Sequence, residues 1–169
     1  MSSPTIFHIA DIHIRRGQHA RIKYAFDQLI EKITNHTSTD KYLVIAGDVF
    51  EYKSQVSQQD LDCFHYLLGG LQIPNLNIIT IPGNHDYSIS SNLDFLKVAL
   101  TNTNYKNVFH YPDSGIFNHG DIDFHVLSPM DMKIPEYTDQ QKAKLVEIAD
   151  KCPVHKTLHS SVRVKTTVV

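Results

Sequence analysis

Three short apolar segments of the chain each end at side chains that can bind metal ions or transfer protons. The segments are Thr5–Ala10, Tyr42–Ala46 and Asn77–Pro82. The polar residues that follow them are, in chain order, Asp11, His13, Asp48, Asn84 and His85. Carboxylate, imidazole and amide groups without a thiolate suit manganese, iron or zinc, whereas a structural zinc site would favour cysteine. The residue types therefore indicate a catalytic metal centre.

A pair of metal ions would give these residues a defined reaction. A carboxylate such as Asp48 can bridge two ions about 3.5 to 4 Å apart, and a pair at that spacing clamps the attacking and leaving oxygens of a phosphoryl group. We therefore expect hydrolysis of phosphate esters, with manganese as the first choice of metal.

The hydrophobic pattern predicts the elements that position these residues. Apolar runs of five or six residues without alternation predict strands that are buried on both faces. Apolar residues at helical spacing predict three helices, at about Ala20–Thr34, Gln58–Leu68 and Asn92–Leu100. The alternating order predicts a layered α/β domain with right-handed crossovers. In such a sheet, ligands bind outside the carboxyl ends of the strands, so the polar residues should meet at one edge.

The second half of the chain has a different pattern. Short β-prone pieces at Asn107–Tyr111, Gly115–Asn118 and Ile122–Leu127 predict a β-meander. An amphipathic helix is predicted at about Asp139–Asp150, followed by a β-prone run from about Lys156. The 169 residues, with 41% apolar and 20% charged side chains, predict a single domain, residues 1–169.

Charge and cysteine usage limit the location and the partners. The net charge of -2 does not attract nucleic acid to the whole protein, so such a contact requires a local basic patch. The candidates are Arg15, Arg16, Arg21 and Lys23, which could equally be the solvated start of a helix. Cys63 and Cys152 form no disulfide framework, and no 18 apolar residues run together. We expect a soluble intracellular protein, cytoplasmic or nuclear, without a membrane partner.

Three motifs at the strand ends resemble a known family. Ala10-Asp11-Ile12-His13, Gly47-Asp48 and Gly83-Asn84-His85-Asp86 resemble, in this order, the first three motifs of the calcineurin-like metallophosphoesterases. The resemblance implies a layered α/β/β/α sandwich with mixed sheets. Within the family, His8–Ile14 and Ala46–Glu51 resemble most the nuclease subunit of the double-strand-break repair complex, the SbcD-like branch.

The resemblance also implies a role for each motif residue. Asp11 and His13 would hold one divalent metal ion, and Asp48 would bridge it to a second ion held by Asn84. Manganese is the expected metal, with iron, zinc or magnesium as alternatives. The remaining two motif residues are the catalytic candidates, His85 for the phosphate and Asp86 for orienting the His85 ring.

The family pattern requires three further histidines, and the sequence supplies them incompletely. Lys156–Val162 resembles the family's apolar strand before a histidine, which makes His159 a metal ligand, with His155 as a less favoured substitute. No glycine is followed by histidine, so a Gly-His-x-His motif is absent from this sequence. We expect either a domain that is incomplete at its C-terminal end or one that binds metal weakly.

Three functions follow as hypotheses. The first is a DNA exonuclease or endonuclease acting on single strands or duplex ends in repair or recombination. The resemblance implies an SMC-like coiled-coil ATPase partner and allows a homodimer. The second is a phosphodiesterase for small nucleotides or other phosphoesters, because the fold does not determine the substrate. The third is a non-catalytic binding module with an incomplete metal site.

Overall fold

A parallel sheet forms the centre of the described part of the chain. The computed structural model describes residues 4–52, 55–88, 91–128, 138–140 and 143. The chain divides into two compact units, residues 1–133 and 134–169, and every element named below belongs to the first. The sheet has the order β1-β2-β3-β6, with all neighbours parallel. Its strands are β1 Thr5–Ile9, β2 Lys41–Ala46, β3 Leu76–Ile81 and β6 Val108–His110.

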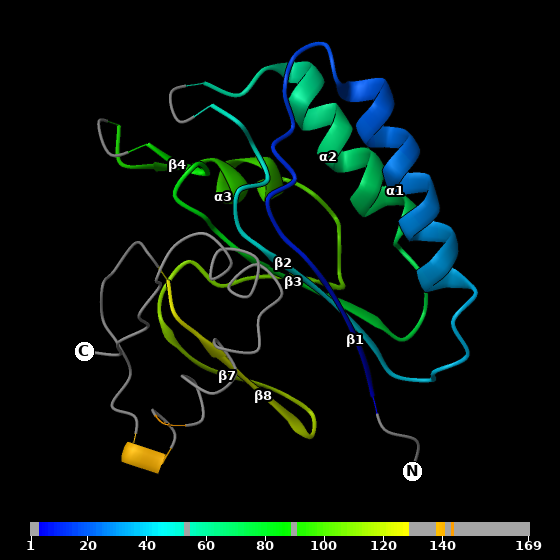
Figure 1. Cartoon of the computed structure of the whole chain (residues 1–169), viewed down its shortest axis with the longest axis vertical. Coiled ribbons are helices and arrows are strands. Elements are labelled where there is room, and N and C mark those ends of the chain that lie inside the picture. The colour runs from blue at the N-terminus through cyan, green and yellow to red at the C-terminus, as the bar shows by residue number, and fades with distance from the viewer. Residues whose placement is uncertain (1–3, 53–54, 89–90, 129–137, 141–142, 144–169) are drawn as a thin grey trace, which may run out of the picture. The chain divides into compact units, whose positions relative to one another are not determined.

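Two helices cover one face of this sheet. They are α1 His19–Thr34 and α2 Gln58–Gly70, which lie side by side in Figure 1. Alternate residues of β2 point to them, and Leu43 and Ile45 are fully buried in the core. The helices contribute apolar residues at helical spacing to the same core, namely Phe26, Ile33, Phe64, Leu67 and Leu68.

A β-hairpin packs against the other face. Its strands, β7 Gly115–His119 and β8 Ile122–Val126, are antiparallel. Tyr42 and Val44 of β2 and Ile79 of β3 form a second buried cluster that contacts Ile122 and Phe124 of the hairpin. Burial on both faces explains why β2 and β3 lack alternation. For β1, which lies at the edge of the sheet with Ile6 50% exposed, the prediction of burial on both faces is wrong. The α/β class is confirmed, and the described residues supply the first three layers, α, β and β.

The smaller elements differ from the prediction. The third helix, α3 Phe95–Leu100, begins later than expected because Asp94 is its N-cap and accepts a hydrogen bond from the Lys97 amide. Its predicted first turn lies in a short antiparallel pair, β4 Tyr87–Ser88 and β5 Leu93–Asp94.

The predicted β-meander is wrong. Strand β6 pairs with β3 in the parallel sheet, and the antiparallel pair nearby is formed by β7 and β8 alone. Of the helix predicted near the C-terminus, residues 139, 140 and 143 are helical, and the run from Lys156 lies outside the described residues. The single-domain prediction stays a prediction. Within the described part of the chain, no helix is long and apolar enough to span a bilayer.

Candidate metal centre

Two loops at the carboxyl ends of β1 and β2 are joined through their main chains. The amide of Asp11 donates to the Gly47 carbonyl at 3.2 Å, and the amide of His13 donates to the Asp48 carbonyl at 3.0 Å. The Ile14 amide continues the series at 2.7 Å to the Val49 carbonyl. These bonds extend the pairing of the strands beyond the sheet and place the first two motifs side by side.

Three residues of these loops have left-handed backbone conformations. The φ angles are 54° for Asp11, 51° for His13 and 53° for Asp48. Positive φ is uncommon for residues other than glycine, and it persists only where the surrounding structure holds it. Because the strained positions coincide with the predicted metal ligands, the strain indicates a functional site.

The same three residues converge as a candidate ligand set. Ligand atoms of Asp11, His13 and Asp48 all lie within 4.8 Å of one another. Two carboxylates and an imidazole match the donors that a divalent cation such as manganese accepts. The Asp11 side chain is 75% exposed, so the cluster is open to solvent. The residues that are present therefore fit one divalent metal ion.

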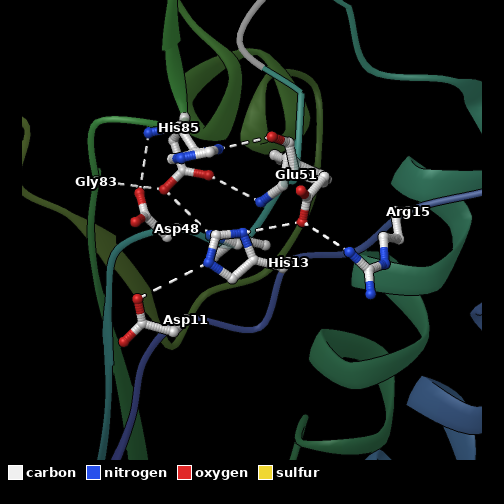
Figure 2. Close-up of polar contacts among 10 residues, drawn as sticks. Asp11, His13, Arg15, Asp48, Glu51, Gly83 and His85 are labelled. Carbon is white, nitrogen blue, oxygen red and sulfur yellow. Dashed lines mark hydrogen bonds and ion pairs between the residues drawn. The ribbon is translucent and has the colours of Figure 1, made fainter. Parts of the chain in front are cut away.

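The His13 ring lies between two carboxylates, as Figure 2 shows. Its Nε2 is 3.9 Å from Asp11 Oδ1, and its Nδ1 is 3.2 Å from Glu51 Oε2. The Nδ1 atom is buried but lacks hydrogen-bond geometry, so we treat the Glu51 contact as electrostatic. The ring thus presents Nε2 to the cluster while Glu51 lies behind it. The sequence reasoning missed this role, although an acidic residue three positions after Asp48 was a usable signal.

The third motif passes directly over Asp48. A Cβ on Gly83 would lie 2.1 Å from Asp48 Oδ1, and a Cβ on Gly47 would lie 2.8 Å from Gly83 Cα. Both positions therefore require glycine. The close approach lets the His85 amide donate to Asp48 Oδ1 at 2.9 Å, which fixes one of the two carboxylate oxygens.

The His85 ring is oriented by the main chain of the second motif. Its Nδ1 lies 2.6 Å from the Glu51 carbonyl oxygen. Because a carbonyl only accepts, Nδ1 must carry the proton, which leaves Nε2 as the nitrogen that can exchange one. The His85 and His13 rings meet edge to face, with centroids 5.0 Å apart. Glu51 therefore contacts both imidazoles, one through its side chain and one through its carbonyl.

The carboxylate of Asp86 has a structural position. It is fully buried and accepts hydrogen bonds from the amides of Val49 at 3.2 Å, Phe50 at 3.0 Å and Gly83 at 2.9 Å. Burial raises the pKa of this carboxyl above its usual value, against the opposing effect of the three amides. Asp86 ties the second motif to the third. This corrects the prediction that it orients the His85 ring, which is held by the Glu51 carbonyl.

The other predicted site residues lie outside the three-residue cluster or outside the described part of the chain. Asn84 is exposed in the turn before His85, and its role as a ligand of a second ion stays a prediction. His159 lies outside the described residues. The Arg15 guanidinium is at the edge of the cluster, 3.5 Å from Glu51 Oε2. Among the described residues, no hydrogen bond or ion pair joins the remaining basic candidates, Arg16, Arg21 and Lys23, to the cluster.

Comparisons with known proteins give the family of this chain. The chain is 33% identical over 128 residues to the "Uncharacterized protein R555" of Acanthamoeba polyphaga mimivirus, a match over 73% of this chain and 9% of that protein. The crystal structure of Pseudomonas putida nuclease MPE aligns with a TM-score of 0.42 and 19% identity, over 63% of this chain and 46% of that chain. Residues 4–161 match the model of the calcineurin-like phosphoesterases, and the chain therefore belongs to that family.

Proposed function

We propose that this chain is a metal-dependent phosphodiesterase domain whose substrate is DNA, a nuclease of the SbcD-like branch that serves repair or recombination. The observation that supports the proposal most directly is the open cluster of Asp11, His13 and Asp48 with the His85 ring beside it. Family membership supports hydrolysis of a phosphoester, and the choice of DNA rests on the motif resemblance.

The residues divide the chemistry between them. Asp11, His13 and Asp48 would hold a divalent ion, which when bound polarises a phosphoryl oxygen and activates water at neutral pH. Asp48 would bridge to a second ion at Asn84. The Glu51 carbonyl keeps the His85 Nδ1 protonated, so a proton on Nε2 can pass to the leaving oxygen. We assign His85 as the general acid.

The choice of a nucleic acid also has local support. Arg15 is half-exposed at the edge of the cluster, where its guanidinium can contact a backbone phosphate next to the one that is cleaved. The expected metal is manganese, with iron, zinc or magnesium as alternatives. An SMC-like ATPase subunit and a second copy of the chain are proposed partners that rest on the motif resemblance.

The test compares substrates with and without a polynucleotide backbone. The full chain is incubated with manganese and, in parallel, a single-stranded oligonucleotide, a blunt duplex or cyclic nucleotides. We expect manganese-dependent cleavage of the oligonucleotide, and its loss in His85→Ala at unchanged manganese affinity. Cleavage of cyclic nucleotides alone would replace DNA by small nucleotides as the substrate. Loss of manganese binding in His85→Ala would make this residue a ligand.

A non-catalytic binding module is the second candidate. The described residues assemble three ligands for one ion, and the sequence has no Gly-His-x-His motif. A site with open positions binds its ion less tightly than one with a full ligand set and its supporting hydrogen bonds. Binding of the oligonucleotide without cleavage at any manganese concentration would favour this function.

A further inference from the structure

A pocket is lined by residues that follow the first two motifs in the chain, and the proposed reaction does not use it. It is a cavity of about 520 Å³, within the range of small-molecule sites. We call it the Tyr52 pocket, and its lining residues are Arg16, Tyr52, Gln55, Val56, Ser57, Gln59 and Asp60. Arg16 and Tyr52 directly follow Arg15 and Glu51, whose charged groups are 3.5 Å apart at the edge of the cluster. The two segments that meet at the Arg15–Glu51 ion pair therefore continue, each by one residue, into the lining of this pocket.

Three kinds of side-chain group in the lining have no interaction partner among the described residues. Tyr52 is 47% exposed, and its ring has no stacking partner among the described residues. Within the same residues, the Arg16 guanidinium has no hydrogen bond or ion pair, and neither do the side-chain amides of Gln55 and Gln59. An aromatic face, a cation and two amides are the groups that receive a base, a phosphate and a base edge.

The acidic residue in the lining has both carboxylate oxygens engaged within the fold. Asp60 accepts hydrogen bonds from the Ser57 amide at 2.9 Å and the Ser57 hydroxyl at 2.6 Å. Its other oxygen lies 2.6 Å from His19 Nε2. This carboxylate is therefore engaged within the fold and caps the start of α2.

We propose that the Tyr52 pocket binds one nucleoside of a single-stranded nucleic acid, next to the phosphodiester at the metal centre. The base stacks on Tyr52, the glutamine amides contact its edge, and Arg16 contacts the adjoining phosphate. This inference rests on the proposed function and adds to it a preference for unpaired strands, because a base can reach a pocket only when it is free of its partner.

The test measures binding without metal, so that it does not depend on catalysis. The probe is a fluorescent single-stranded thymidine oligonucleotide, and its binding is measured by fluorescence anisotropy. A second probe has the same sugar-phosphate backbone with abasic sites in place of the thymidines. We expect Tyr52→Ala to weaken binding of the normal probe by about 5- to 100-fold and Tyr52→Phe to leave it unchanged, because the ring is what stacks. Tyr24→Ala is the matched control, since Tyr24 is 67% exposed on α1 outside the pocket.

The abasic probe and the salt dependence distinguish the contacts. Tyr52→Ala should not weaken binding of the abasic probe further. Arg16→Ala should reduce the slope of log Kd against log salt by about 0.7, the value for one phosphate contact on a single strand. Equal binding by wild type and Tyr52→Ala, equal loss for both probes, or no binding by wild type would overturn the inference. Binding that depends on Tyr52 without cleavage would uphold the pocket and refute the nuclease. Cleavage of the oligonucleotide that is unaffected by Tyr52→Ala would uphold the nuclease and refute the pocket.

Discussion

The contact between Gly83 and Asp48 makes Gly83→Ala a sharp test of the site geometry. The added Cβ would lie 2.1 Å from Asp48 Oδ1 and 2.4 Å from the Asp48 amide nitrogen, whereas real Cβ contacts stay beyond 3.0 Å. The carboxylate must therefore move by about 0.9 Å, while metal–ligand distances tolerate changes of about 0.2 Å. Overpacking of this kind also costs about 1–3 kcal/mol of stability.

The expected result is a loss of metal binding that exceeds the loss of stability. We expect the affinity for manganese to fall by about 100-fold or more, measured by calorimetry, because the effect reaches a ligand and not only its supporting hydrogen bonds. Urea denaturation gives the free energy of unfolding of the same samples. Variants should be compared at a temperature where both are folded.

Gly69→Ala is the matched control for this change. Gly69 lies in α2, and a Cβ there would meet nothing within 4 Å. We expect this variant to bind manganese as wild type does and to gain roughly 0.5–1 kcal/mol, because alanine loses less entropy than glycine in a helix. The reasoning is refuted if Gly83→Ala binds manganese and unfolds like the control.

Three further predictions concern single side chains. Asp48→Asn should abolish manganese binding and turnover, because an amide carries no charge to neutralise the ion; calorimetry that still detects tight binding would contradict this. Glu51→Gln should weaken manganese binding by about 10- to 100-fold, because the carboxylate lies 3.2 Å from His13 Nδ1, and an unchanged affinity would remove Glu51 from the site. Ser57→Ala should lower the free energy of unfolding by about 1 kcal/mol at pH 7. Burial favours the neutral form of the Asp60 carboxyl, but hydrogen bonds from Ser57 and His19 outweigh it and hold the pKa of this group below its usual value. The stabilisation is therefore present at neutral pH and should be lost as the pH falls through this lowered pKa; a difference that stays constant in urea titrations would be contrary evidence.

The strands and the gathering of the motif residues were predictable from local pattern. Tyr42–Ala46 is an uninterrupted apolar run, and the structure buries it on both faces as β2. Because parallel strands end at a common edge, the placement of Asp11, His13 and Asp48 in one cluster followed from the same pattern. Periodicity and strand order carried this information, and neither depends on side-chain detail.

Other features depend on contacts that a local pattern does not contain. Strand β6 has three residues, and its place in the sheet comes from pairing Val108 with Ile78, thirty positions earlier. The role of Glu51 was missed and that of Asp86 was misjudged, because both depend on how the motif loops turn. The left-handed conformation of Asp48 and the close approach of Gly83 bring the buried Asp86 carboxylate to backbone amides, and leave His85 to the Glu51 carbonyl.

The main-chain hydrogen bonds between the first two motif loops hold the loop conformation independently of the side chains that bind metal. The amides of Asp11, His13 and Ile14 hold the loops together through atoms that every residue other than proline possesses. Replacing an acidic or imidazole group there removes a metal ligand but leaves these bonds in place. A lineage can thus lose catalysis in one substitution and keep the surface that recognises its substrate. Active and inactive relatives of this domain should therefore share one backbone and differ in very few side chains.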